Sequence, residues 1–208
     1  MMRQYYELRY YQLRNGVAGR LPTSKPAGLT GPFGAFTAFI AESGPFMILL
    51  LTYSSLGEAE HIDEKLADVT GYIRYERTLL RAFAGMPELK IPAASRSARI
   101  FELRTYESND AVTLQKKIDM FNNGEMQIFQ RLGMDPVFFG EALVGGRLPH
   151  LTYMLAFNDL AARDKAWKAF GSDPEWLKLR AKPGLSDAEI VSNISNMIIR
   201  PAAFSDIR

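Results

Sequence analysis

The chain repeats a pattern in which apolar side chains alternate with charged ones. Residues 6–11 read YELRYY and residues 101–106 read FELRTY, so an aromatic residue, Glu, Leu, Arg and Tyr recur in the same order. Alternation with a period of two is typical of a β-strand whose two faces differ. Each copy is followed by two more apolar strands, a helix and a final strand, which indicates an internal repeat.

The second copy shows the complete order of elements. Strands are predicted at 98–107, 136–145, 148–157 and 188–200, and the helical spacing of apolar residues predicts a long helix at 111–132 with a kink at NNG, 122–124. A further helix contains Trp167 and Phe170, and SDPEW at 172–176 restarts it, with Asp173 as the N-cap and Pro174 in the first turn. This β-α-β-β-α-β order is ferredoxin-like.

The first copy has the same order with one helix missing. Its strands are predicted at 3–14, 33–42, 46–54 and 71–83, with a helix at 56–68, whereas residues 16–32 hold four glycines and three prolines and cannot form a long helix. We therefore expect an α+β fold of two tandem ferredoxin-like units, residues 1–83 and 98–208, joined by a linker at 84–97. Their antiparallel sheets are expected to pack face to face as an α+β barrel.

The charged face of the repeated strand supplies the first candidate site. If the two sheets pack face to face, the polar sets point into the barrel interior, where each charge needs a partner or a polar ligand. The alternative is a solvated face with ordinary ion pairs. The residues concerned are Glu7, Arg9 and Tyr11 in the first copy and Glu102, Arg104 and Tyr106 in the second.

Four residues on later strands are expected to join this interior. Alternation separates Phe138 from Phe139, and we place Phe139 inward because Glu141, two residues on, fits poorly against helices. Tyr153 and Arg200 are added as further candidates for the interior. The polar groups satisfy one another or hold a ligand, and the sequence leaves both possibilities open.

Composition narrows the chemistry. The 208 residues are 47% hydrophobic and 23% charged, which is ordinary for a globular protein, and the net charge of +2 comes with no basic stripe, so we expect no nucleic-acid partner. There is no cysteine, and the two histidines, His61 and His150, do not have metal-ligand spacing. We expect no metal site and no cofactor. His61 is interpreted as a surface residue and His150 as a strand-edge or cavity-mouth residue.

The apolar run PFMILLLTY at 45–53 is too short to cross a membrane and is predicted to be a buried strand. The first residues lack the apolar core of a signal peptide. Together with the absence of cysteine, these features lead us to expect a cytoplasmic protein without a membrane span.

The phrases YELRYYQLR, FELRTYES, SDPEW and NMIIRPAAFS resemble the NIPSNAP family. The resemblance covers residues 99–208 and, more loosely, the first copy, and it departs from the family at 16–32. It implies ferredoxin-like units paired as a dimeric α+β barrel, and it carries over no catalytic residues. The wider barrel superfamily includes cofactor-free monooxygenases, haem-degrading enzymes and small-molecule binders.

Two functions of different classes follow. One is a barrel that binds a small hydrophobic or aromatic molecule, with a cofactor-independent monooxygenase as its enzymatic form. The other is a module that binds or assembles with proteins. Because only one helix covers the first sheet, apolar residues such as Leu8, Phe36, Ile48 and Leu50 are expected to be left bare, which predicts a homo-oligomer, most simply a dimer.

Overall fold

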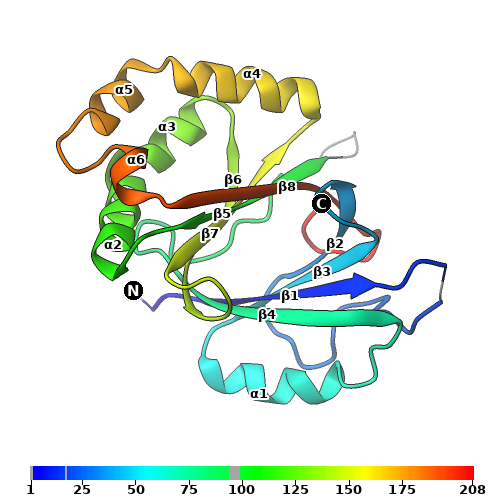
Figure 1. Cartoon of the computed structure of the whole chain (residues 1–208). Coiled ribbons are helices and arrows are strands. Elements are labelled where there is room, and N and C mark those ends of the chain that lie inside the picture. Colours follow the sequence, from blue (N-terminus) through cyan, green and yellow to red (C-terminus); the bar gives the residue numbers. More distant parts are fainter. Residues whose placement is uncertain (1, 17, 94–98) are drawn as a thin grey trace.

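The structure is a computed structural model that describes residues 2–16, 18–93 and 99–208. Within these residues, strands from the two halves of the chain close into one antiparallel barrel (Figure 1). The order around the barrel is β1-β3-β2-β8-β5-β7-β6-β4. The strands are β1 (Tyr5–Leu13), β2 (Phe33–Ile40), β3 (Phe46–Tyr53), β4 (Tyr72–Ala82), β5 (Ile100–Glu107), β6 (Asp135–Val144), β7 (His150–Phe157) and β8 (Asn193–Pro201).

The helices form two separate layers outside the barrel. One helix follows β3, and the others belong to the second half and gather on the opposite side (Figure 1). They are α1 (Leu56–Lys65), α2 (Ala111–Met120), α3 (Met126–Arg131), α4 (Leu160–Gly171), α5 (Pro174–Arg180) and α6 (Asp187–Ile190). The kink expected at 122–124 is a π-helical turn, Phe121–Glu125, between α2 and α3.

Side-chain caps fix where the helices of the second half begin. Asp110 caps α2 through Thr113, and Asp159 caps α4 by accepting from the Ala162 backbone N–H at 2.7 Å. Asp173 accepts from the backbone N–H groups of Glu175 and Trp176, which confirms the predicted N-cap before Pro174. These short polar side chains satisfy backbone donors that have no partner inside a helix.

Two short seams join the halves. In one, Leu79–Ala82 of β4 pairs with the end of β6, and in the other, β2 pairs with Ile198–Pro201 of β8. Gly140 lies in the first seam, where the position of a Cβ would be 2.8 Å from the Cβ of Leu80. A glycine at this position lets the two backbones approach.

One end of the barrel interior is filled by apolar side chains from both halves. Tyr6 packs against Phe138 with ring centroids 5.1 Å apart, and Phe36 packs against Phe101 at 5.3 Å. All four side chains are fully buried. The face of β1 that carries Tyr6 and the face of β5 that carries Phe101 therefore meet inside the barrel.

The last strand is shorter than expected. Residues 188–190 belong to the helical turn α6, and β8 begins only at Asn193, so the prediction of a strand over 188–200 is wrong at its start. Ser186 and Glu189 form a capping box, a hydrogen-bonding pattern that favours a helical turn.

The apolar residues that we expected to be bare in the first sheet are buried in the described structure. The described part of 16–32 contains no helix, but its Leu29 is buried together with Ile62 of α1, and the C-terminal Phe204 packs on the same cluster. Leu8, Phe36, Ile48 and Leu50 lie in the barrel interior. The bare face from which an oligomer was predicted is therefore covered within the chain.

The segment between the halves is held to both of them. The Leu89 backbone N–H donates to Gln4 Oε1 at 2.7 Å, and the Lys90 backbone N–H donates to the Val137 carbonyl at 2.9 Å. Residues 94–97 of the expected linker, and residue 98 where the second unit was expected to begin, lie outside the described residues. No helix in the described part of the chain has the length and apolar character needed to span a membrane.

Candidate functional site

The two charged sets lie on the outer face of the barrel, beneath the helices, so the prediction that they face the interior is wrong. Leu8 and Leu103 belong to the interior core cluster. Since neighbouring side chains of a strand point to opposite faces, Glu7 and Glu102 point outward, toward α1 and α4 respectively. The physical reason is that the helices supply partners for these charges.

The first set joins β1 to α1. Glu7 accepts from Arg9 Nε at 2.6 Å, from Arg77 Nε at 2.6 Å and from the Tyr53 hydroxyl at 2.8 Å. Asp63 of α1 accepts from Arg9 Nη2 at 2.6 Å and from Arg77 Nη1 at 2.7 Å. Burial opposes ionisation of Asp63, but the hydrogen bonds and charges of the two arginines outweigh it and lower its pKa.

The second set joins β5 to α4 in the same manner. Glu102 is fully buried and accepts from Arg163 Nη2 at 2.7 Å, Trp167 Nε1 at 2.7 Å, Arg104 Nη1 at 2.8 Å and Asn196 Nδ2 at 3.0 Å. Burial by itself would raise the pKa of Glu102, but the bond from Arg163 and the charge of Arg104 outweigh burial and lower it. A carboxylate with four donor groups is fully satisfied by the protein.

The aromatic candidates lie in the same outer layer. The Tyr153 hydroxyl donates to the Tyr106 hydroxyl at 2.9 Å, and Phe139 stacks on Tyr153 with ring centroids 5.2 Å apart. Phe121 from the π-helical turn packs on all three rings. Phe139 and Tyr153 are thus core residues between the sheet and the helices rather than interior residues.

The remaining candidates also face outward. Tyr11 stacks on Tyr75 with centroids 5.5 Å apart. Glu141 accepts from Arg81 at 2.7 Å across the seam, and the exposed Arg200 lies over the Phe39 ring at 3.5 Å. None of the ten candidates lines the cavity described next. A role for them in ligand binding stays a prediction, while their contacts hold the helices on the barrel.

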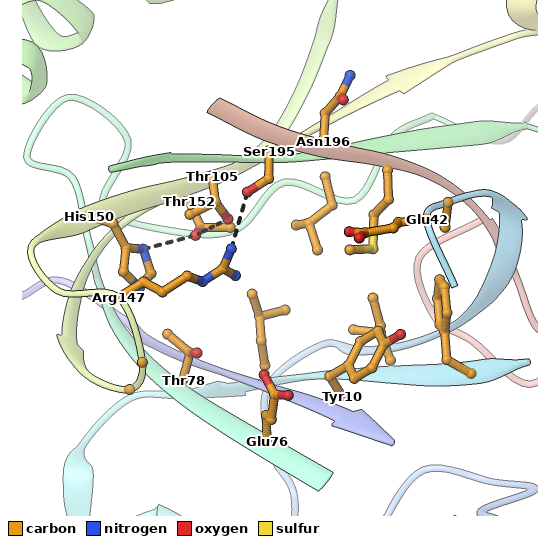
Figure 2. A pocket seen from close by; sticks show the side chains of 18 of the residues that line it. Tyr10, Glu42, Glu76, Thr78, Thr105, Arg147, His150, Thr152, Ser195 and Asn196 are labelled. Carbon is orange, nitrogen blue, oxygen red and sulfur yellow. Dashed lines mark hydrogen bonds between the residues drawn. The ribbon is translucent and has the colours of Figure 1, made fainter. Parts of the chain in front are cut away.

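A cavity of about 770 Å³ occupies the other end of the barrel (Figure 2). Its apolar wall comes from side chains of the inward face of four strands, Leu8, Ile48, Leu103 and Met197. Ligand pockets commonly have volumes of about 300–1,000 Å³ and combine apolar walls with a few polar groups. The barrel thus has one packed end and one hollow end.

Polar groups converge on one side of this cavity. The Thr105 and Thr152 hydroxyls are 2.9 Å apart, and Thr152 Oγ1 is 3.4 Å from His150 Nδ1. Figure 2 shows His150, Thr152, Thr105 and Ser195 grouped around the Arg147 side chain. Tyr10 and Glu76 lie on the opposite wall.

His150 is the buried titratable group of the cavity. It is only 4% exposed, and this burial together with the charge of Arg147 lowers its pKa, although the backbone of Leu151 and the charge of Glu107 oppose the shift. The imidazole is therefore neutral near pH 7, with one nitrogen able to accept a hydrogen bond or a proton. His150 is the first residue of β7 and also lines the cavity, so the structure agrees with both placements that we considered.

Arg147 lies in the turn between β6 and β7 with φ 58°, a left-handed conformation that is uncommon for residues other than glycine. Its Nη1 is 3.4 Å from both Ser195 Oγ and Glu107 Oε1. The turn thereby carries a guanidinium to the cavity edge, next to His150.

Sequence reasoning missed most of this site. Thr105 is in FELRTYE, but it lies on the face that we assigned to the helices, and Thr152 and Ser195 have no distinguishing neighbours. A usable signal was the break in apolar character at Thr105 and Thr152, which interrupts otherwise apolar strand faces. Polar residues in such places indicate water or a ligand.

The second half of the chain matches a known protein family. The sequence profile of the NIPSNAP family matches residues 101–206, so the chain belongs to the NIPSNAP family. A NIPSNAP family protein of unknown function from Agrobacterium tumefaciens is 21% identical over 55% of this chain and 97% of its own, with a TM-score of 0.48. No curated protein matches the sequence.

Two solved structures resemble the whole barrel. A candidate monooxygenase from Lactobacillus acidophilus covers 98% of this chain and 97% of its own at 9% identity, with a TM-score of 0.62. The match to an anthrone oxidase-like protein covers 96% of this chain and 92% of that protein at 9% identity, with a TM-score of 0.59. At these identities the likeness establishes the fold alone.

Proposed function

We propose that this protein binds a small, partly apolar molecule in the cavity at the hollow end of the barrel. The main support for this proposal is the cavity of about 770 Å³, whose apolar wall faces a cluster of His150, Thr105 and Thr152. An apolar or aromatic body would pack on Leu8 and Leu103. A hydroxyl or carbonyl on the same molecule would bond the polar cluster, which fixes its orientation.

The barrel that holds this cavity is, in our proposal, a pair of tandem ferredoxin-like units at 1–83 and 98–208. The neighbour order is β4-β1-β3-β2 in the first half and β8-β5-β7-β6 in the second. It supports the proposal, since each half lists its fourth, first, third and second strand in the same direction around the barrel. In both halves the helix after the third strand binds a charged side chain of the first strand: Asp63 of α1 accepts from Arg9, and Trp167 of α4 donates to Glu102.

A fluorescent probe tests the binding proposal. The dye 8-anilinonaphthalene-1-sulfonate combines aromatic rings with an acidic group, and we expect its emission to rise and saturate on the folded protein. Thr105→Trp places an indole in the cavity wall and should reduce the affinity at least tenfold. Val112→Trp on the exposed side of α2 is the matched control, because Val112 is 67% exposed and is not among the residues that line the cavity.

Equal dye binding by both variants would contradict the cavity as the site. The comparison requires that both variants unfold cooperatively with similar midpoints, because this dye also binds partly unfolded chains. If neither the parent nor the variants bind the dye or a panel of small aromatic compounds, the binding proposal is contradicted. That result would favour a module that binds proteins instead.

A second candidate function is a cofactor-independent monooxygenase. The observation in its favour is the neutral His150 at the cavity wall, which is able to take a proton from an acidic C–H or O–H of a bound substrate. The resulting carbanion or enolate would then react with O2, and conversion of the CH2 group to a carbonyl takes one oxygen atom of O2 into the product and releases the other as water. An oxygen electrode with anthrone tests this. Uptake that His150→Gln abolishes supports it, and no uptake above the buffer rate contradicts it.

A further inference from the structure

The first part of β4 has an unpaired edge. Strand β4 pairs with β1 along residues 72–81, but it pairs with β6 only from Leu79 onward. Among the described residues, 72–78 therefore have a strand neighbour on one side only. Five consecutive residues of this stretch, 73–77, are exposed, and Ile73 and Tyr75 are 63% and 46% exposed.

Such an edge is available for pairing with another strand. Backbone N–H and C=O groups along an open edge act as a template for a further strand, and proteins usually block them with charges, bulges or covering segments. The charges here are Arg74 and Glu76, which are 61% and 63% exposed and lie 3.4 Å apart on the same strand face. Their order determines which strand fits beside them.

We propose that β4 pairs with the β4 of a second copy of this chain, antiparallel, with Tyr75 at the two-fold axis. In this register Arg74 of each copy lies opposite Glu76 of the other, which makes two cross-strand ion pairs. Opposite charges in directly facing positions stabilise antiparallel pairs, and like charges destabilise them. A two-fold axis makes the contact self-complementary and closes the assembly at two copies.

Other symmetric registers are less favourable. Antiparallel pairing about a two-fold axis keeps each face on the same side, so one residue must face its own copy. Centring on Arg74 places two arginines opposite each other, centring on Glu76 places two glutamates, and centring on Arg77 again places two arginines. Of the three charged centres and Tyr75, only Tyr75 pairs opposite charges. Tyr75 is also held in position by stacking on Tyr11.

This contact also changes the cavity. Arg74, Glu76 and Thr78 line the cavity, and they lie on the edge at which the second copy joins. Figure 2 shows Glu76 and Thr78 on the cavity wall. The facing strand of the partner would extend the sheet past this wall, so the partner would add its own Arg74 and Glu76 beside the entrance. The inference rests on the β4 edge and does not require a ligand.

Sedimentation equilibrium of the full chain tests the proposal through a charge swap. The parent should sediment as a dimer of the 23.4 kDa chain at micromolar concentration. Arg74→Glu and Glu76→Arg should each weaken dimerisation at least tenfold, because like charges then face each other. The double variant restores opposite charges and should recover the dimer. A monomeric parent, or a dimer that both single variants leave intact, overturns the proposal.

Disulfide cross-linking locates the axis independently. The chain has no cysteine, so Tyr75→Cys introduces a single thiol. Facing residues of an antiparallel pair have Cα atoms about 4.5–5.5 Å apart, within the range of a disulfide. Mild oxidation should therefore give a covalent dimer of Tyr75→Cys and none of Val112→Cys, whose position on α2 is more exposed than that of Tyr75. Equal cross-linking of both variants contradicts the assigned axis.

Discussion

The indole N–H of Trp167 donates to the carboxylate of Glu102 at 2.7 Å, which joins helix α4 to strand β5 across the outer face of the barrel. Arg163, one turn earlier on α4, makes two bonds to the same carboxylate, at 2.7 and 2.9 Å. The repeated charged strand therefore holds a helix onto the sheet. In the first half, Glu7, Arg9 and Asp63 of α1 do the same.

Removing the Glu102 carboxylate should destabilise the fold strongly. In Glu102→Ala, the half-buried Arg104 and the donors on α4 lose the fully buried carboxylate that they share. Breaking a buried pair typically costs about 3–5 kcal/mol. Urea unfolding measures the change. Arg20→Ala is the control, since its exposed pair with Asp68 is worth under about 1 kcal/mol. A loss for Glu102→Ala as small as that of the control would contradict the structural role of this carboxylate.

Arg104→Ala should behave like Glu102→Ala. Arg104 is half-buried between Glu102 and the Trp167 ring, with its guanidinium carbon 4.5 Å from the ring centroid. Its removal takes away both an ion pair and a cation–π contact. We expect a loss of several kcal/mol in urea unfolding, and a change too small to measure would indicate a solvated strand face.

Asp63→Ala should act locally. The side chain is 45% exposed, so the effect on global stability is expected to be about 1 kcal/mol or less. Because Arg9 and Arg77 both bond Asp63, its removal should free α1 from the sheet. Hydrogen exchange followed by mass spectrometry should show faster exchange in residues 56–65 and unchanged exchange in α4. Uniform acceleration over the whole chain would contradict this local role.

Gly140→Val should weaken the seam between the halves. A Cβ at this position meets the Leu80 Cβ at 2.8 Å, and overpacking of this kind costs about 1–3 kcal/mol. Thermal unfolding measures the loss. Gly146→Val is the control, because nothing lies within 4 Å of its Cβ position. Equal stability of the two variants would contradict the close approach of β4 and β6.

The pH dependence of folding should reveal the burial of His150. Its pKa is lowered in the folded state, so the unfolded chain binds a proton at a higher pH than the folded chain does. The stability that comes from the neutral imidazole is therefore complete above the ordinary histidine pKa near 6.5 and falls as the pH drops below it. The unfolding midpoint of His150→Gln should therefore depend less on pH than that of the parent between about pH 7 and 5. Parallel curves for the two proteins would contradict the buried, neutral state.

The sequence predicted the elements of the fold well because local signals determine them. Alternation placed the strands, and the N-cap at Asp173 placed the start of α5. The start of β8 was wrong because the Ser186–Glu189 capping box was overlooked. These are short-range features that can be checked in the sequence alone.

The orientation of the strands could not be predicted in the same way. Alternation separates Glu102 from Leu103 but does not say which face meets the helices. The deciding partners, Arg163 and Trp167, are about sixty residues away in the sequence and reach Glu102 only through the fold. The cavity residues Thr105, His150 and Ser195 likewise come from three separate strands and the pairing between them.

Histidine NMR provides the most direct test of the cavity as a binding site. The chain has two histidines, and only His150 lines the cavity, while His61 lies on the exposed side of α1. With ¹⁵N-labelled histidine and His61→Gln for assignment, titration with 8-anilinonaphthalene-1-sulfonate should shift the ring signals of His150 saturably and leave those of His61 in place. Saturable binding of the dye with unchanged His150 signals would contradict the account.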